Sequence, residues 1–553
     1  MSTLALVRYY SLIRSMVAKG RSVQITRVIV KNYRCLRDCD TVLNPELNII
    51  VGNNECGKST LLEAIHVTLS GMLNGRPLLG ELHPHLFNHG AVKEYLSALK
   101  DAKPAPPPAI LIELYFADHD DLAALKGTNN SLKLDGPGVK LTVAFNEDYK
   151  AEYASYVADP KVVRTVPVEY YSIRLRHFGD TDITPRAVPI KPTLIDASTI
   201  RNNAAASRYV VDIMKDSLSR KEQVDLALTY RLMRDRFLDE DKVKAINGEL
   251  EKKKGSISSK TLSVALDTSG RSGWEAGVMP QLDDVPIPLV GKGEQNGVKI
   301  KLALETSADS HLVLIEEAEN HLSHSSLNAL IEHIASKRAN RQVLITTHSS
   351  FVLNKLGIDN VLLFSRKASA TLKALDSETL DYFRKLPGHD TLRLILAQRS
   401  ILVEGPSDEL IVQAAFKKKH GKMPLEAGVD VISVRALAFK RFLAIAKLLK
   451  LLVDVVTDND GSVDAVNNRY SDYFGIDGIE FRFDTDEAFP TLEPQLLKAN
   501  DLATVNKILG KTFKTDAELL TYMEGHKAEV ALKFFESETP WKVPAYIEAA
   551  IAE

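Results

Sequence analysis

The sequence carries a phosphate-binding pattern near its start. Residues 52–59 are Gly-Asn-Asn-Glu-Cys-Gly-Lys-Ser and match G-x-x-x-x-G-K-[ST], between an apolar stretch at 47–51 and a predicted helix start at Lys58. Backbone N–H groups at such a helix start close around phosphate oxygens, Lys58 reaches the β- and γ-phosphates, and the Ser59 hydroxyl can ligate Mg²⁺. The residues expected to bind ATP are Gly52, Asn53, Asn54, Glu55, Cys56, Gly57, Lys58, Ser59 and Thr60.

Further polar residues follow two later apolar stretches. Glu316 and Glu317 come directly after residues 312–315, where we expect Glu316 to hold the nucleotide's metal and Glu317 to activate water. His348 follows residues 342–346 and is suited to sensing the γ-phosphate or its attacking water, although a lone histidine there is more often structural. One further segment opens a predicted helix and can meet the phosphate of a nucleotide bound by a second subunit: Gly293, Glu294 and Gln295.

A second group of acids lies in the last third of the chain. Glu404 and Asp408 follow the apolar stretch 401–403, and Asp458 and Asp460 follow 452–456. Because neighbouring parallel strands end at one edge of a sheet, we expect these acids to converge. Four carboxylates in one place require raised pKa values or divalent cations, so we predict a Mg²⁺ site, with Mn²⁺ or Ca²⁺ as alternatives, suited to phosphodiester chemistry. Any one acid alone is equally compatible with a helix cap or a turn.

Periodicity places these residues on alternating strands and helices, which predicts an α/β protein. Helical periodicity between 204 and 254 predicts an inserted helical arm. We also expect a linker at 385–390, before a second, smaller parallel unit. The predicted strands are 23–30, 47–51, 110–116, 139–145, 312–315, 343–346, 361–364, 401–403, 429–434 and 452–456.

Composition excludes several classes of protein. The chain has 553 residues, of which 45% are hydrophobic and 26% charged, so it is neither disordered nor fibrous. No apolar run reaches the roughly 18 residues that span a bilayer. Three cysteines cannot form a disulfide framework, and a reducing cytoplasm fits best. The formal charge of −2 means that a polyanion must be met by a local basic patch, for which Lys440, Arg441 and Lys447 are the foremost candidates.

The order of motifs over residues 22–370 resembles the ABC-type ATPases of the SMC and RecF-like branch, including an opening strand that ends in Lys-Asn-Tyr-Arg at 31–34. The resemblance implies a head-to-head dimer in which residues 291–295 complete a neighbour's ATP site. Two departures imply slow turnover or a switch: Lys292 replaces the usual signature serine, and no glutamine occurs between Ile25 and Glu222. Glu316 replaces the usual Walker B aspartate but keeps the carboxylate.

The last part resembles the Toprim domain, through Glu-Gly at 404–405 and Asp-x-Asp at 458–460. An ABC-type ATPase followed by Toprim is the arrangement of the overcoming lysogenisation defect (OLD) nucleases. That resemblance implies a metal-ligand role for Glu493 and a role for Lys527 in offsetting charge on the transition-state phosphate. For each of these two residues the alternative is an ordinary surface charge.

The expected chain organisation is a leader or mis-assigned start at 1–22, ATPase parts at 23–195 and 266–385, a helical, dimerising insertion at 196–265, and a Toprim domain at 395–553. The expected function is ATP-regulated, metal-dependent cleavage or nicking of DNA. The resemblance further implies anti-phage defence, with a helicase or a reverse transcriptase and its retron DNA as partner. The alternatives are an ATP-driven DNA clamp whose Toprim part is a scaffold, and a primase- or topoisomerase-like activity.

Overall fold

The computed structural model divides into two compact units, which are described separately. Unit 1 comprises Met1–Gln24 and Val188–Ile345, and unit 2 comprises Ile25–Ala187 and Thr346–Glu553. The residues that the structure describes are 23–52, 56–101, 106–160, 163–196, 210–211, 214–215, 218–254, 259–266, 273–306, 312–337, 341–349, 352, 358–364, 369–371, 375–385, 389–434 and 438–552. The expected leader at 1–22 lies outside them.

The N-terminal part of unit 2 contains an antiparallel sheet in the order β2-β1-β6-β8-β7, with β9 also paired to β8. Its strands are β1 (Ile25–Tyr33), β2 (Leu36–Val42), β6 (Ile110–Phe116), β7 (Lys126–Gly127), β8 (Gly136–Phe145) and β9 (Tyr171–His177). Val28 pairs with Leu114, and both side chains are fully buried, as expected for apolar residues on the core face of a strand. The predicted strands at 23–30, 110–116 and 139–145 are confirmed.

A second strand group of unit 2 positions the phosphate-binding segment. β3 (Leu47–Gly52) pairs in parallel with β15 (Val361–Phe364), which pairs antiparallel with β16 (Ser369–Thr371). Every residue of β3 is buried, so the strand is apolar throughout instead of alternating. After β3 the chain enters α2 (Lys58–Ser70), which buries Leu61, Leu62 and Ile65. The other helices of this part are α3 (His89–Lys100) and α4 (Lys150–Tyr156), and β4 (Met72–Leu73) and β5 (Arg76–Pro77) form a small hairpin.

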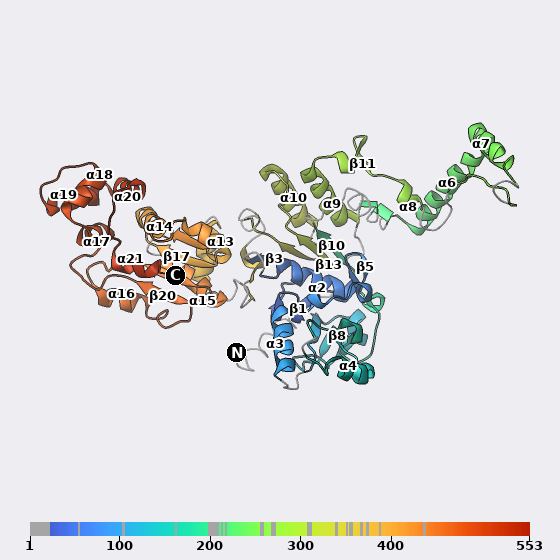
Figure 1. Cartoon of the computed structure of the whole chain (residues 1–553), viewed down its shortest axis with the longest axis horizontal. Helices are drawn as coiled ribbons and strands as arrows, with labels where there is room; N and C mark the ends of the chain where they lie inside the picture. Colours follow the sequence, from blue (N-terminus) through green and yellow to red (C-terminus); the bar gives the residue numbers. More distant parts are fainter. Residues whose placement is uncertain are drawn as a thin grey trace. The chain divides into compact units, whose positions relative to one another are not determined.

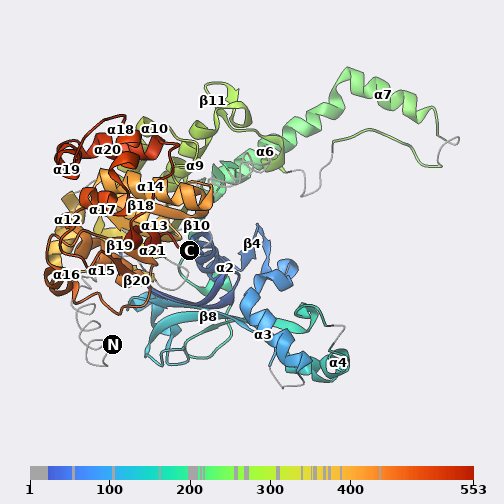
Figure 2. The same ribbon diagram turned by 60° about the vertical axis from the view of Figure 1, so that its left-hand side comes forward.

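Unit 1 contains three parallel strands, β10 (Pro192–Asp196), β13 (Leu312–Glu316) and β14 (Gln342–Thr346), with β13 paired to both neighbours. Helices α9 (Lys292–Thr306) and α10 (His324–Lys337) pack against each other. The arm helices α6 (Arg220–Asp239) and α7 (Asp241–Glu251) extend outward in both views (Figures 1 and 2). No residue of α6 is buried, and Val224, Leu228 and Leu232 are exposed. The unit also has α8 (Trp274–Gly277), β11 (Gln281–Leu282) and β12 (Val285–Pro286).

The C-terminal part of unit 2 is a parallel sheet in the order β18-β17-β19-β20. Its strands are β17 (Arg399–Val403), β18 (Val429–Ser433), β19 (Val453–Val456) and β20 (Ile479–Arg482). Its helices are α14 (Pro406–His420), α15 (Phe439–Leu449), α16 (Val463–Tyr470), α17 (Leu492–Ala499), α18 (Leu502–Leu509), α19 (Asp516–Gly525), α20 (Lys527–Glu536) and α21 (Ala545–Ala550). The predicted second α/β unit is confirmed.

The expected linker at 385–390 falls between two helices and partly outside the described residues, so it stays a prediction. α12 (Ser377–Lys385) includes the first of its residues, and α13 (His389–Leu396) begins at the fifth, while 386–388 lie outside the described residues. Leu394 and Ile395 of α13 are buried.

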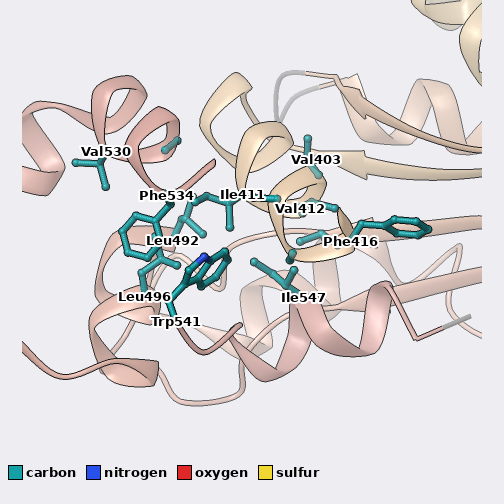
Figure 3. Packing of buried hydrophobic residues seen from close by; sticks show 14 of the residues in the cluster. Val403, Ile411, Val412, Phe416, Leu492, Leu496, Val530, Phe534, Trp541 and Ile547 are labelled. Carbon is teal, nitrogen blue, oxygen red and sulfur yellow. The ribbon is translucent and has the colours of Figure 1, made fainter. Parts of the chain in front are cut away.

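One apolar cluster holds the C-terminal helices against the sheet. It joins β17 and α14 to α17, α20 and α21, with Val403, Ile411, Leu496, Phe534 and Ile547 among its members (Figure 3). The rings of Phe534 and Trp541 meet edge to face, with centroids 5.1 Å apart. The cluster includes α14, which follows β17, and α17, which follows β20.

Two further findings concern the described residues. Among the described residues, no helix is long and apolar enough to cross a membrane. Cys35, Cys39 and Cys56 are free thiols.

Truncating Phe534 should destabilise the C-terminal part. Phe534 is 1% exposed, whereas Leu532 on the same helix is 44% exposed. Phe534→Ala should lower the free energy of unfolding by about 3–5 kcal/mol, because it removes buried apolar surface and leaves a cavity. Urea unfolding followed by Trp541 fluorescence in a Trp274→Phe background measures this, with Leu532→Ala as the control. Equal losses in both variants would contradict the assignment of Phe534 to the core.

Candidate acidic centre and nucleotide-binding residues

The phosphate-binding segment has the local structure that its sequence predicts. Gly57 caps α2 with φ 105°, and an added Cβ would lie 2.5 Å from a Leu36 methyl group, so only glycine fits. The buried Lys58 donates from Nζ to the Gly52 carbonyl at 2.9 Å, across the loop. Ser59 is exposed, and the Thr60 hydroxyl lies 3.3 Å from the Cys35 Sγ. Asn53, Asn54 and Glu55 lie outside the described residues.

His348 lies beside this segment within unit 2. It follows β14 by two residues and is partly exposed. The N–H of Thr347 donates to the Ile50 carbonyl at 3.1 Å, so the chain that carries His348 runs along β3, whose end opens the loop. The backbone next to His348 therefore contacts the strand that precedes the P-loop, and the role of His348 as a sensor stays a prediction.

The remaining nucleotide candidates come together in unit 1. Glu316 ends β13, and Glu317 follows in a left-handed conformation with φ 46° while accepting from Asn320 Nδ2 at 2.6 Å. The start of α9 packs on the same segment, because an added Cβ on Gly293 would lie 2.2 Å from the His321 carbonyl oxygen. The buried Asn296 donates to the Asn320 carbonyl at 3.1 Å. Glu294 and Gln295 are on the first turn of α9, as predicted.

The P-loop and these unit 1 residues belong to different compact units. A single nucleotide site formed by both groups therefore stays a prediction.

In the C-terminal part, the acids at the ends of β17 and β19 meet. Glu404 follows β17, and its Oε1 accepts from the Thr457 hydroxyl at 2.5 Å and from the Asp458 N–H at 3.0 Å. Parallel pairing of β17 with β19 brings these two strand ends to one edge. The expected convergence of Glu404 with Asp458 is thus present.

Asp408, Glu493 and Lys527 complete this acidic centre. Asp408 lies in the first turn of α14 and accepts from the Gly405 N–H at 3.1 Å. Glu493, on α17, is buried, and its Oε2 forms a 3.0 Å ion pair with Nζ of Lys527. Lys527, which lies 34 positions after Glu493 in the sequence, thereby places its positive charge at the Glu493 carboxylate. Lys527 and Glu493, the two residues that the sequence resemblance suggested, are therefore in direct contact.

Electrostatics show that the carboxylates act on one another. Burial, followed by the charges of Asp408, Glu404, Glu493 and Asp460, raises the pKa of Asp458 to about 9. Burial and the charges of Glu404 and Glu493 raise the pKa of Asp408 to about 7. Burial alone would lower the pKa of Lys527, but its bond to Glu493 and the charges of Asp458 and Asp408 raise it.

The donor set is chemically suited to a divalent cation, because hard cations prefer carboxylate oxygens and would relieve this repulsion. Among the described residues, however, no three His, Cys, Asp or Glu side chains are arranged closely enough to hold a metal ion. The carboxyl groups influence one another electrostatically, but they do not form a group that could hold a metal ion in this structure. Their assignment as metal ligands stays a prediction.

Asp460 is the least embedded of the candidate acids. Its side chain is exposed, its φ is 50°, and its Oδ2 lies 3.5 Å from Nη1 of Arg469. Its charge nevertheless contributes to the raised pKa of Asp458. Asp460 therefore borders the centre from the solvent side.

Two of the three foremost basic candidates already have partners within the chain. Arg441 pairs with Glu378 at 2.8 Å and stacks 4.4 Å from the ring centroid of Tyr382. Lys447 lies 5.9 Å from the ring centroid of Tyr473. These contacts favour a role in packing α15, and a phosphate-binding role stays a prediction.

Sequence reasoning missed two residues of the centre. The buried Asn459 lies between the two aspartates, where a turn explains an asparagine equally well. Tyr546, on α21, is buried, and burial together with Asp458 and Asp408 raises its pKa. No local motif marks Tyr546, so only the fold could reveal it.

The raised pKa of Asp458 predicts how the metal-free chain responds to pH. The carboxyl titrates at 3.8 when unfolded and at about 9 when folded, so the folded chain keeps a proton that the unfolded chain loses, and stability falls as pH rises between these values. Asp458→Asn should therefore be more stable than wild type at pH 8, by on the order of 1 kcal/mol or more, since one pKa unit is about 1.4 kcal/mol. The difference should shrink at pH 5.

Urea unfolding in EDTA at both pH values measures this, with the exposed Asp477→Asn as the control. A less stable Asp458→Asn at pH 8 would show that the carboxyl is not under repulsion.

Comparison with known proteins gives three domain matches. Residues 24–146 match an AAA ATPase domain, residues 275–354 match an AAA domain described as a putative AbiEii toxin of a type IV toxin–antitoxin system, and residues 395–460 match the TOPRIM domain of overcoming lysogenization defect protein-like proteins. The first match contains the P-loop, and the second contains Glu316. The third contains Glu404 and Asp458.

Curated relatives match over short segments. The DNA replication and repair protein RecF of Vibrio vulnificus is 34% identical over 71 residues, 12% of this chain and 20% of the relative. RecF of Lacticaseibacillus casei is 40% identical over 45 residues, 8% of this chain and 12% of the relative. The chain thus covers a fifth or less of the length of these relatives.

Solved structures were also matched. An SMC head bound to the C-terminal winged-helix domain of ScpA has 15% identity and a TM-score of 0.35, over 64% of this chain and all of the other. The C-terminal region of the Xanthomonas campestris OLD protein has 22% identity and a TM-score of 0.23, over 28% of this chain and 93% of the other. The domain matches by themselves show that the chain combines an AAA ATPase domain with a C-terminal OLD-like TOPRIM domain.

Proposed function

We propose that the chain is an ATP-regulated, divalent-metal-dependent DNA endonuclease or nickase of the OLD type. The observation that carries this proposal is the convergence of Glu404, Asp408, Asp458 and Glu493, from separate elements, with Lys527 paired to Glu493. The match of residues 395–460 to an OLD-like TOPRIM domain supports it independently of the geometry. An acidic centre with one lysine at its edge suits a phosphodiester better than a neutral substrate, because a cation held there attracts phosphate oxygens.

The chain's own residues would divide the work as follows. Glu404, Asp408, Asp458, Asp460 and Glu493 would hold Mg²⁺ or Mn²⁺, which when bound activates water and stabilises the leaving oxygen. Lys527 would contact a phosphate oxygen and offset its charge, because its side chain is half exposed beside the buried Glu493. The Thr457 hydroxyl orients Glu404 through its 2.5 Å hydrogen bond.

The ATPase part would control this cutting. Lys58 and Ser59 would bind the phosphates of ATP and its Mg²⁺, Glu316 and Glu317 would serve the same nucleotide, and residues 293–295 would complete the site of a second subunit. The exposed apolar side chains of α6 are consistent with pairing of two arms in a homodimer. We extend the proposal to a cytoplasmic protein of prokaryotic anti-phage defence, acting with a helicase or a reverse transcriptase and its retron DNA.

One observation favours a second candidate function. Because no three described acids are arranged to hold a metal, the chain is also compatible with an ATP-driven DNA clamp whose TOPRIM part is a scaffold. The two candidates differ in whether purified protein cuts DNA by itself.

Loss of a central acid should abolish cutting. Glu404→Ala and Asp458→Ala should each reduce nicking of supercoiled plasmid by more than the roughly 100-fold typical of residues that only support metal ligands. ATP binding should be unchanged in both variants. Agarose-gel assays with Mg²⁺, Mn²⁺ or Ca²⁺ measure cutting, and exposed Asp477→Asn is the matched control. If wild type cuts with none of these ions, the clamp function is favoured instead.

Removing the P-loop lysine should separate control from chemistry. Lys58→Ala should lose ATP binding, because the ammonium group that meets the phosphates is gone, while the acidic centre is unaltered. Its DNA cutting should then be the same with and without ATP, in contrast to wild type. Fluorescent ATP-analogue binding and plasmid cutting measure the two effects. A Lys58→Ala variant that still responds to ATP would contradict this assignment.

A further inference from the structure

The side chain of Asn459 is fully engaged between two candidate metal ligands. It is 2% exposed, and its Nδ2 donates to the carbonyl oxygens of Asp484 and Asp486 at 2.9 and 3.0 Å. Its Oδ1 accepts from the Gly461 N–H at 2.8 Å. A simple asparagine turn needs only the last of these bonds. The two Nδ2 bonds reach 25 and 27 residues along the chain and tie Asn459 to the segment after β20.

Lys498 holds that segment, residues 484–490, in place. Its Nζ lies 2.9 Å from Oδ2 of Asp484 and 3.0 Å from Oδ2 of Asp486, and 4.7 Å from the ring centroid of Phe489. The N–H of Asp486 also donates to Oδ1 of Asp484 at 2.8 Å. The carbonyl groups that accept hydrogen bonds from Asn459 belong to Asp484 and Asp486, and the side chains of these two residues are held by Lys498.

The same segment reaches the other acids of the centre. The N–H of Asp460 donates to the Pro490 carbonyl at 3.2 Å, and the N–H of Val463 donates to Oε1 of Glu487 at 2.8 Å. Glu493 lies in the first turn of α17, three residues after Pro490. Residues 484–490 thus connect the Asp458–Asp460 turn with the helix that carries Glu493.

We propose that Asn459 and Lys498 are positioning residues that hold Asp458 and Asp460 in register with Glu493, and so set the affinity of the acidic centre for a divalent cation. This inference rests on the proposed function of the centre. Residues that orient metal ligands through hydrogen bonds typically change metal affinity by 10–100-fold when they are replaced. Neither residue touches the cation in this scheme, so neither is catalytic.

The chain provides a matched control in Asn500, at the other end of α17. Its Nδ2 donates to the carbonyl oxygens of Leu496 and Lys542, each at 2.9 Å, and its Oδ1 accepts from the Lys542 N–H at 2.7 Å. Asn500→Ala therefore removes the same three kinds of hydrogen bond as Asn459→Ala. It does so away from the Asp458–Asp460 turn.

The test is direct Mn²⁺ binding by the full chain, measured by titration calorimetry. Asn459→Ala and Lys498→Met should each raise the Mn²⁺ dissociation constant by about 10–100-fold. Asn500→Ala should bind as wild type does, and Lys498→Arg should recover much of the affinity lost in Lys498→Met, because it keeps the charge. At saturating Mn²⁺, the plasmid-cutting rate of Asn459→Ala should approach that of wild type.

Near-UV circular dichroism checks that each variant is folded. If Asn459→Ala is not folded, the comparison of Lys498→Met with Lys498→Arg tests the inference. Wild-type affinity in Asn459→Ala, or in Lys498→Met, would overturn the inference while leaving the proposed function standing. Failure of wild type to bind Mn²⁺, or unchanged binding by Glu404→Ala, would instead remove the proposed function and the inference with it.

Discussion

Glu404, Asp408, Asp458 and Glu493 bring four carboxyl groups into one partly buried region, where they repel one another when charged. The pKa of Asp458 rises to about 9 because burial and four neighbouring acids disfavour its charged form. Such a region is stable only if protons, a cation or a basic side chain compensate the charges. Lys527 offers one positive charge to Glu493, and in the proposed function a divalent ion compensates the remaining carboxylates.

A carboxylate on β19 itself has its charge compensated in a different way. Asp454, near the start of that strand, is buried but pairs with Arg399 at 2.7 Å and with Arg482 at 3.2 Å. Its charge is balanced within the protein, and it serves the sheet. Asp458, just beyond the other end of the strand, is surrounded by acids instead. One short strand thus carries a structural carboxylate at one end and a reactive candidate at the other.

The nucleotide-binding candidates depend on backbone shape more than on charge. Gly57 adopts a left-handed conformation against Leu36, and Gly293 lets α9 approach the His321 carbonyl, so both positions exclude a side chain. Glu317 also has a positive φ and is held by Asn320. Strain of this kind is common at functional sites, where surrounding structure fixes a residue in an unfavourable conformation.

The sequence by itself determined the α/β class and the strands before the P-loop and before Glu316, Glu404 and Asp458, because these features depend on local periodicity and short motifs. Only the tertiary structure decided that Lys527 pairs with Glu493, that Tyr546 borders the acids, and that Asn459 holds residues 484–490. Those contacts join residues far apart in sequence, and packing of helices on the sheet, which no local pattern encodes, brings them together.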